Sequence, residues 1–137
     1  MLKSIELKAK IENFEALSTW ISNTAASWNL NNLLMNKINI CLEEIFVNIS
    51  SYAYKNQIGL AKISIDKNDN ENEIILIFED EGVKYNPLLK NDPDITLSYD
   101  ERPIGGLGIY MVKEMANDVE YKRINNKNQL TLKFKID

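Results

Sequence analysis

Apolar and polar residues alternate over three parts of the chain, which is the pattern of β-strands with one face in the core. These parts are residues 2–11, 60–66 and 130–136. Residues 74–78 are instead a continuous apolar run rich in isoleucine, and such a run is typical of a central strand. A fifth strand is expected at 119–123.

Three other segments repeat apolar residues every three or four positions, as amphipathic helices do. The first follows Asn13, which we expect to cap it, the second runs from Leu33 to about Tyr54, and the third begins at Leu107. The polar residues 125–128 predict a hairpin turn between the last two strands. The order β-α-α-β-β-loop-α-β-β predicts an α+β fold, a two-layer sandwich. Its sheet would be mixed and mostly antiparallel, with three helices on one face.

The composition is that of one globular domain, which we expect to span residues 1–137. The net charge of −4 does not favour a nucleic-acid surface, which would be basic. No apolar run approaches the roughly 18 residues that a membrane span needs, so we expect no contact with a membrane.

Two residue counts limit the chemistry of the chain. Cys41 is the single cysteine, so an intramolecular disulfide is excluded, and a cytoplasmic location in a reducing environment fits this count. The sequence contains no histidine, which excludes His-ligated metal sites and both Ser-His and Cys-His catalysis. A general base would therefore be a carboxylate or a less usual group.

The second predicted helix carries a carboxylate and a carboxamide one turn apart, at Glu44 and Asn48. Glu44 can take a proton from a hydroxyl group or position a water molecule. The Asn48 amide offers an oxygen ligand, which Mg²⁺ prefers. The alternative is a solvated polar helix face. The same helical period places Tyr52 on the buried stripe with Ile45 and Ile49.

Asp80 ends the predicted central strand and is followed by Glu81 and Gly82. A carboxylate at this place can accept a hydrogen bond from an exocyclic amine, and Gly82 lets the following backbone lie close to a flat ring. An ordinary turn is the alternative, because Asp and Gly both favour turns.

Three of the five glycines, Gly105, Gly106 and Gly108, gather at the start of the third predicted helix. A glycine turn that opens into a helix leaves free backbone N–H groups at the positive end of the helix dipole, which favours an anion such as phosphate. The alternative is a glycine-rich loop before an ordinary core helix.

The segment 83–103 has no clear periodicity and contains all three prolines. Because it joins the two glycine-containing stretches, we expect it to form a lid over a bound nucleotide. Arg102 would then reach a phosphate when the lid is closed, and the alternative is that Arg102 is a solvated surface charge.

The motifs of other nucleotide-binding proteins are absent from this sequence. It lacks the Walker motif G-x-x-x-x-G-K-[ST] and the signature set of eukaryotic-type protein kinases. Met111 stands where a Rossmann fingerprint needs Gly or Ala.

In their order along the chain, the three candidate stretches resemble those of one family. The chain is similar to the ATP-binding domain of the gyrase, heat-shock chaperone and histidine-kinase (GHKL) ATPase superfamily, and more closely to its anti-sigma-factor serine kinases. Residues 44–48 (EIFVN) match the N box, 80–87 (DEGVKYNP) match the first glycine box, and 105–112 (GGLGIYMV) match the second. The chain departs from many relatives at Tyr52, where they carry His, and at Ile49, where they carry a small residue.

The resemblance implies that Glu44 is the catalytic base, that Asn48 binds Mg²⁺ beside the nucleotide, and that Asp80 binds the amine of adenine. It implies further nucleotide contacts from Gly82, Tyr85, Gly105, Gly106, Leu107, Gly108 and Ile109, and the expected lid adds Arg102 to them.

The resemblance also implies an activity, which is the phosphorylation of a serine on a small anti-sigma-factor antagonist with ATP and Mg²⁺. A sigma factor would be the second partner, a homodimer the assembled form, and no direct contact with nucleic acid is implied. The alternative is a non-catalytic, ATP-gated protein-binding module of the same fold. The presence of Glu44 favours the enzyme.

Overall fold

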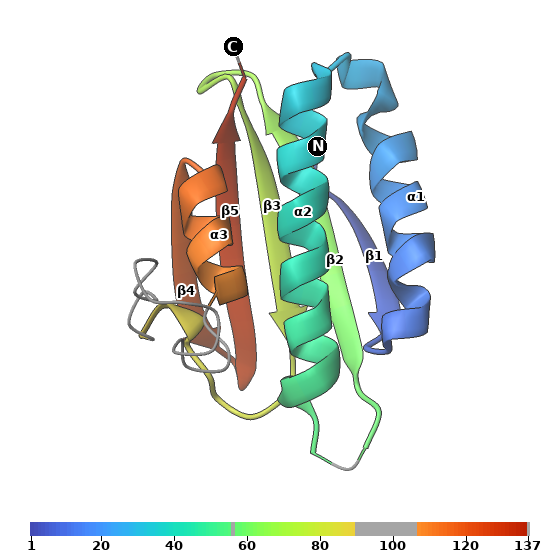
Figure 1. The fold of residues 1–137 in the computed structure, drawn as a ribbon, viewed down its shortest axis with the longest axis vertical. Coiled ribbons are helices and arrows are strands. Elements are labelled where there is room, and N and C mark those ends of the chain that lie inside the picture. The colour runs from blue at the N-terminus through green and yellow to red at the C-terminus, as the bar shows by residue number, and fades with distance from the viewer. Residues whose placement is uncertain (56, 90–106, 137) are drawn as a thin grey trace, which may run out of the picture.

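The protein is a five-stranded sheet covered on one face by three helices, and the computed structural model describes residues 1–55, 57–89 and 107–136 (Figure 1). The strands are β1 (Lys3–Lys8), β2 (Leu60–Asn68), β3 (Glu73–Asp80), β4 (Asp118–Ile124) and β5 (Lys127–Lys135). The helices are α1 (Phe14–Ala25), α2 (Asn32–Asn48) and α3 (Leu107–Met115). The predicted α+β two-layer sandwich is confirmed.

The strands lie in the order β1-β2-β3-β5-β4, and each neighbouring pair is antiparallel. The sequence predicts a mixed sheet, whereas every pairing within the described residues is antiparallel. Short turns join β2 to β3 and β4 to β5, and such hairpins can connect only antiparallel neighbours. The central strand is β3, as the continuous apolar run predicts.

The core forms between α2 and the middle of the sheet. The strand register places Ile63, Phe78 and Leu130 side by side on β2, β3 and β5, and none of them is more than 6% exposed. The buried stripe of α2 that packs on this row includes Ile38, Cys41, Leu42 and Ile45. Burial of one such aliphatic side chain is worth about 1.5–3 kcal/mol. Packing on the sheet therefore fixes which face α2 presents to the rest of the molecule.

The helix caps differ in part from the prediction. Asn13 precedes α1 but makes no capping bond, because its Nδ2 donates to the carbonyl oxygen of Lys8 at 2.9 Å. Asn31 caps α2, since its Oδ1 accepts the N–H of Leu34 at 2.8 Å. None of the helices in the described residues is long and apolar enough to cross a bilayer.

The hairpin between β4 and β5 is tighter than predicted. Its turn consists of Asn125 and Asn126, with φ of 52° and 62°, because a two-residue type I′ turn needs positive φ at both places. Asn128, which the sequence places in the turn, instead belongs to β5 and pairs with Asp80 of β3. This register brings an amide side chain next to the carboxylate that ends β3.

Candidate functional site

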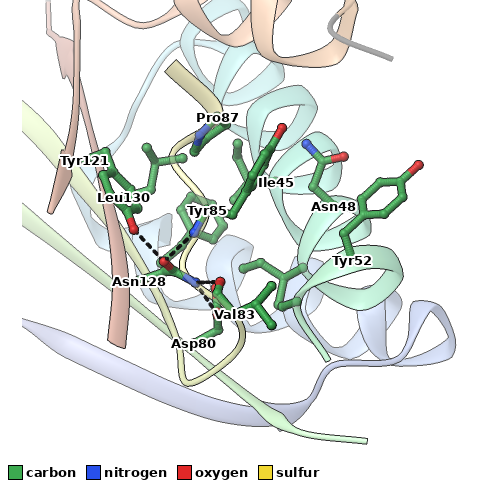
Figure 2. Close-up of a pocket in the computed structure, with 13 residues that line it drawn as sticks. Ile45, Asn48, Tyr52, Asp80, Val83, Tyr85, Pro87, Tyr121, Asn128 and Leu130 are labelled. Atoms are coloured by element: carbon green, nitrogen blue, oxygen red, sulfur yellow. Dashed lines mark hydrogen bonds between the residues drawn. The ribbon is translucent and has the colours of Figure 1, made fainter. Parts of the chain in front are cut away.

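A cavity of about 60 Å³ lies on the helix-covered face of the sheet, between the carboxyl end of α2 and the end of β3 (Figure 2). Its lining residues are Ile45, Asn48, Ile49, Tyr52, Ala53, Phe78, Asp80, Val83, Tyr85, Pro87, Tyr121, Asn128 and Leu130. Most of these side chains are apolar or aromatic, and a small number of polar groups lie among them. This combination is typical of small-molecule sites.

The turn that follows α2 shapes one wall of the cavity. The sequence predicts a regular helix to about Tyr54, but after Asn48 the chain forms a π-helical turn over Ile49–Ala53. Because a π-helical turn holds an extra residue, it rotates the side chains that follow it. Tyr52, predicted to be buried, is 68% exposed and lines the cavity together with Asn48. Turns of this kind occur frequently at functional sites.

Gly82 lies where no other residue fits without movement of the backbone. A Cβ atom at this position would be 2.2 Å from the carbonyl oxygen of Ala53. The next residue, Val83, donates its N–H to the same oxygen at 3.0 Å. The close approach that Gly82 permits is therefore to the π-helical turn, and its contact with a nucleotide stays a prediction.

Asp80 presents a buried carboxylate to the cavity, with 7% of the residue exposed. Its Oδ1 accepts two hydrogen bonds at 2.9 Å, one from the N–H of Gly82 and one from Nδ2 of Asn128. Within the part of the chain that the structure describes, Oδ1 accepts both hydrogen bonds to this carboxylate. Its other oxygen, Oδ2, is therefore available to a donor on a ligand.

The sequence-based prediction missed Asn128, although it lies at the centre of the polar contacts in Figure 2. Besides Asp80, its side chain bonds to Val83, Tyr85 and Tyr121. One signal in the sequence was available. In β5 the inward positions after Asn128 are all apolar, so a buried amide in that row departs from the pattern.

Glu44 and Gly108 are brought together although they lie on different helices. A Cβ atom at Gly108 would be 2.3 Å from Oε2 of Glu44, so the carboxylate rests against the amino end of α3. The amino end of a helix carries a partial positive charge, which favours a carboxylate at this place. Glu44 is half-buried and does not line the cavity itself.

The remaining predicted site residues either are placed by the structure or lie outside the residues that it describes. Tyr85 lines the cavity, and Ile109 is only 4% exposed, so its side chain belongs to the core. Leu107 begins α3. Arg102, Gly105, Gly106 and most of the predicted lid over 83–103 lie outside the described residues.

The described residues contain no group of three or more His, Cys, Asp or Glu side chains that could hold a metal ion. The Asn48 amide is a suitable oxygen ligand for Mg²⁺, but a single oxygen does not make a site. Magnesium usually keeps several waters and binds through one or two protein oxygens together with substrate phosphates. The single oxygen ligand of Asn48 therefore fits a Mg²⁺ ion that binds as a complex with a phosphorylated ligand.

The one cysteine near this site is unreactive. Burial, together with a smaller contribution from the nearby Glu44 carboxylate, raises the pKa of the Cys41 thiol to about 12. Because the thiolate is the nucleophile, a thiol with this pKa does not take part in chemistry at neutral pH. Glu44 is left as the candidate base at the junction of α2 and α3.

Comparison with known proteins places the chain in a family. Residues 7–134 match the sequence profile of the histidine kinase-like ATPase domain. The chain belongs to the histidine kinase-like ATPase family. This confirms the predicted membership of the GHKL superfamily and makes the chain an ATPase-type domain.

Two relatives of this histidine kinase-like ATPase are informative. The serine/threonine-protein kinase BtrW of Bordetella bronchiseptica is 26% identical over 113 residues, which are 82% of this chain and 79% of that protein. A crystal structure of the RsbU and RsbW domains of Rv1364c from Mycobacterium tuberculosis has a TM-score of 0.66 at 11% identity. The match covers 99% of this chain but only 32% of the solved one, and it confirms the fold. The kinase name of the first relative agrees with the closer resemblance to anti-sigma-factor kinases.

Proposed function

We propose that this protein is an ATP-dependent serine/threonine kinase that phosphorylates a small antagonist protein of the anti-sigma-factor type. The observation that carries the proposal is the placement of two carboxylates. Asp80 is buried in the cavity with one oxygen available to a ligand, and Glu44 lies at the amino end of α3. The similarity to a protein named as a serine/threonine kinase supports transfer to a protein hydroxyl.

Each binding residue has a distinct task in this proposal. Oδ2 of Asp80 accepts a hydrogen bond from the exocyclic amine of adenine, while the apolar walls of the cavity hold the ring. The amino end of α3 attracts the phosphates through its N–H groups. Asn48 gives an oxygen ligand to Mg²⁺, which neutralises phosphate charge when it is bound.

Glu44 acts as the general base for the partner's serine. It accepts the proton of the hydroxyl group while the hydroxyl oxygen bonds to the γ-phosphorus. The bond from that phosphorus to the bridging oxygen breaks, and ADP leaves with the electron pair. For this step the Glu44 carboxylate, which lies against the amino end of α3, has to reach the proton of the partner's hydroxyl group.

The Glu44→Gln variant tests the catalytic assignment. It should keep its affinity for ATP but lose phosphoryl transfer by about 10²–10⁴-fold, because glutamine keeps the shape and removes the base. The measurement is transfer of labelled phosphate to candidate antagonist proteins, with ATP affinity from calorimetry. Glu43→Gln is the matched control, because Glu43 is the neighbouring residue and is exposed. Equal transfer by Glu44→Gln and wild type would reject Glu44 as the base, and no transfer by wild type would favour the ATP-gated binding module.

A further inference from the structure

Asn128 is a polar residue at a position where β5 otherwise faces the core. It is 7% exposed, and the inward positions that follow it on the same strand are Leu130, Leu132 and Phe134. Burial of an amide costs free energy unless its hydrogen bonds are made. At the edge of the cavity, each donor and acceptor of this buried amide therefore needs a hydrogen-bond partner.

All the hydrogen-bonding capacity of this amide is used within the protein. Nδ2 donates to Oδ1 of Asp80 at 2.9 Å and to the carbonyl oxygen of Val83 at 2.8 Å. Oδ1 accepts from the N–H of Tyr85 at 3.2 Å and from the hydroxyl of Tyr121. An asparagine has two donors and two lone pairs, so no capacity remains for a ligand. Any hydrogen-bonding effect of Asn128 on a bound nucleobase therefore acts through the residues that it holds.

The partners also determine which way the amide points. The carbonyl oxygen of Val83 can only accept and the N–H of Tyr85 can only donate, so exchange of Oδ1 with Nδ2 would break both bonds. With the amide in this orientation, Nδ2 and the N–H of Gly82 occupy Oδ1 of Asp80. The carboxylate is held in one rotamer, with Oδ2 as the acceptor that remains.

The fixed rotamer has a consequence for base selection. Adenine carries an exocyclic amine, a donor, at the position where guanine carries a carbonyl oxygen, an acceptor. A carboxylate oxygen can only accept, so it pairs with adenine and opposes the guanine carbonyl. If Asp80 were free to turn away, this opposition would weaken.

We propose that Asn128 is a positioning residue that sets the selectivity of the site for adenine over guanine by holding Asp80. Its amide also ties the loop 82–85 to β5, and Arg123 of β4 supports that loop through a bond from Nη1 to the carbonyl oxygen of Gly82 at 3.0 Å. This inference rests on the proposed binding of ATP in this cavity.

The test is the ratio of ATP to GTP affinity, measured by calorimetry with Mg²⁺ for wild type and for Asn128→Ser and Asn128→Leu. Leucine has no donor, and the hydroxyl of serine lies one bond closer to the backbone than Nδ2 of Asn128 and does not reach Asp80. In both variants the ratio should therefore fall at least tenfold, through weaker ATP binding and stronger GTP binding. A loss of packing alone would weaken both nucleotides together and leave the ratio unchanged. Asn128→Ser is the smaller change and decides the question if Asn128→Leu does not fold.

Two controls define the outcomes of this test. Gln129→Ala changes the next residue of β5, which lies on the opposite face of the strand, and should keep the wild-type ratio. Tyr121→Phe removes only the hydroxyl donor to Oδ1 and leaves the donor to Asp80, so its ratio should fall less than that of Asn128→Ser. A wild-type ratio in Asn128→Ser would overturn the inference while ATP binding stands. Wild type that binds neither nucleotide would overturn the proposed function as well.

Discussion

At the residue scale, Glu44 and Gly108 depend on each other. An alanine at position 108 would place its Cβ 2.3 Å from Oε2 of Glu44, so the carboxylate would have to move. The obstacle is the far end of a flexible side chain, and alanine favours a helix over glycine by about 1 kcal/mol. The fold should therefore tolerate the change, while the carboxylate of Glu44, the proposed general base, is displaced.

We expect Gly108→Ala to lower phosphoryl transfer on the order of 10²-fold, the size of effect that a misplacement of about 1 Å can have. Its unfolding free energy in urea should be equal to that of wild type or slightly higher. In a Glu44→Gln background the same substitution should have little further effect on transfer, because the group that it displaces is already inactive. Full transfer by the single variant would show that the position of Glu44 is not critical.

Cys41 makes stability depend on pH above neutrality. Its folded-state pKa is about 12, against 9.0 for the unperturbed thiol, so the folded protein retains a proton that the unfolded chain releases. This contribution is present below about pH 9 and is lost as the pH rises toward 12, at up to about 1.4 kcal/mol per pH unit.

The unfolding free energy of wild type should thus fall more steeply than that of Cys41→Ala as the pH rises above about 9. Denaturant titrations in a reducing buffer measure both slopes. The substitution itself lowers stability at all pH values, so the comparison is between slopes and not between absolute values. Parallel slopes would mean that the thiol ionises as easily in the folded protein as in the unfolded chain.

At the scale of elements, the contact between the π-helical turn and the loop after β3 defines the cavity wall. The obstacle at Gly82 is backbone, because a Cβ atom there meets the carbonyl oxygen of Ala53 at 2.2 Å and its carbonyl carbon at 2.6 Å. Backbone cannot swing aside as the Glu44 carboxylate can. The two glycines should therefore respond to alanine in different ways.

Gly82→Ala should separate the loop from the turn and break the bond from Val83 to Ala53. We expect a loss of about 1–3 kcal/mol in unfolding free energy, since a buried acceptor loses its partner and the packing is strained. ATP affinity should fall with it, because Asp80 and Tyr85 lie on either side of the change. Urea denaturation and calorimetry test this, and a variant as stable as wild type would show that the wall adapts freely.

At the scale of the whole molecule, nucleotide binding should raise stability by mass action. A ligand that binds only the folded state adds about 2.7 kcal/mol at a concentration of 100 times its Kd. The melting temperature should rise by several degrees with ATP and Mg²⁺ and by less with GTP. In Asp80→Asn, most of the difference between the melting-temperature shifts with ATP and with GTP should be lost, because an asparagine also presents N–H donors to the nucleobase. Equal shifts with ATP and GTP in wild type would contradict the role of Asp80.

Much of this fold was predictable because its signals are local. Alternation along β2 and β5 and the apolar run of β3 each follow from a few neighbouring residues. The candidate residues Glu44, Asn48 and Asp80 were also predictable, because polar groups next to buried stripes and strand ends depart from a local pattern. The order of the elements then indicated two layers, since helices and hairpins in this order have few ways to share one core.

The sequence by itself determined the five strands and the three helices, and it indicated two candidate carboxylates, Glu44 within α2 and Asp80 at the end of β3. Only the tertiary structure decided which groups meet. Gly108 lies against Glu44 although many residues separate them, and the two-residue turn shifts Asn128 into β5 opposite Asp80, with which it is hydrogen-bonded. The physical reason is that periodicity records which face of an element is buried. Hydrogen bonds between distant segments depend on strand register and helix packing, which no single stretch of the chain encodes.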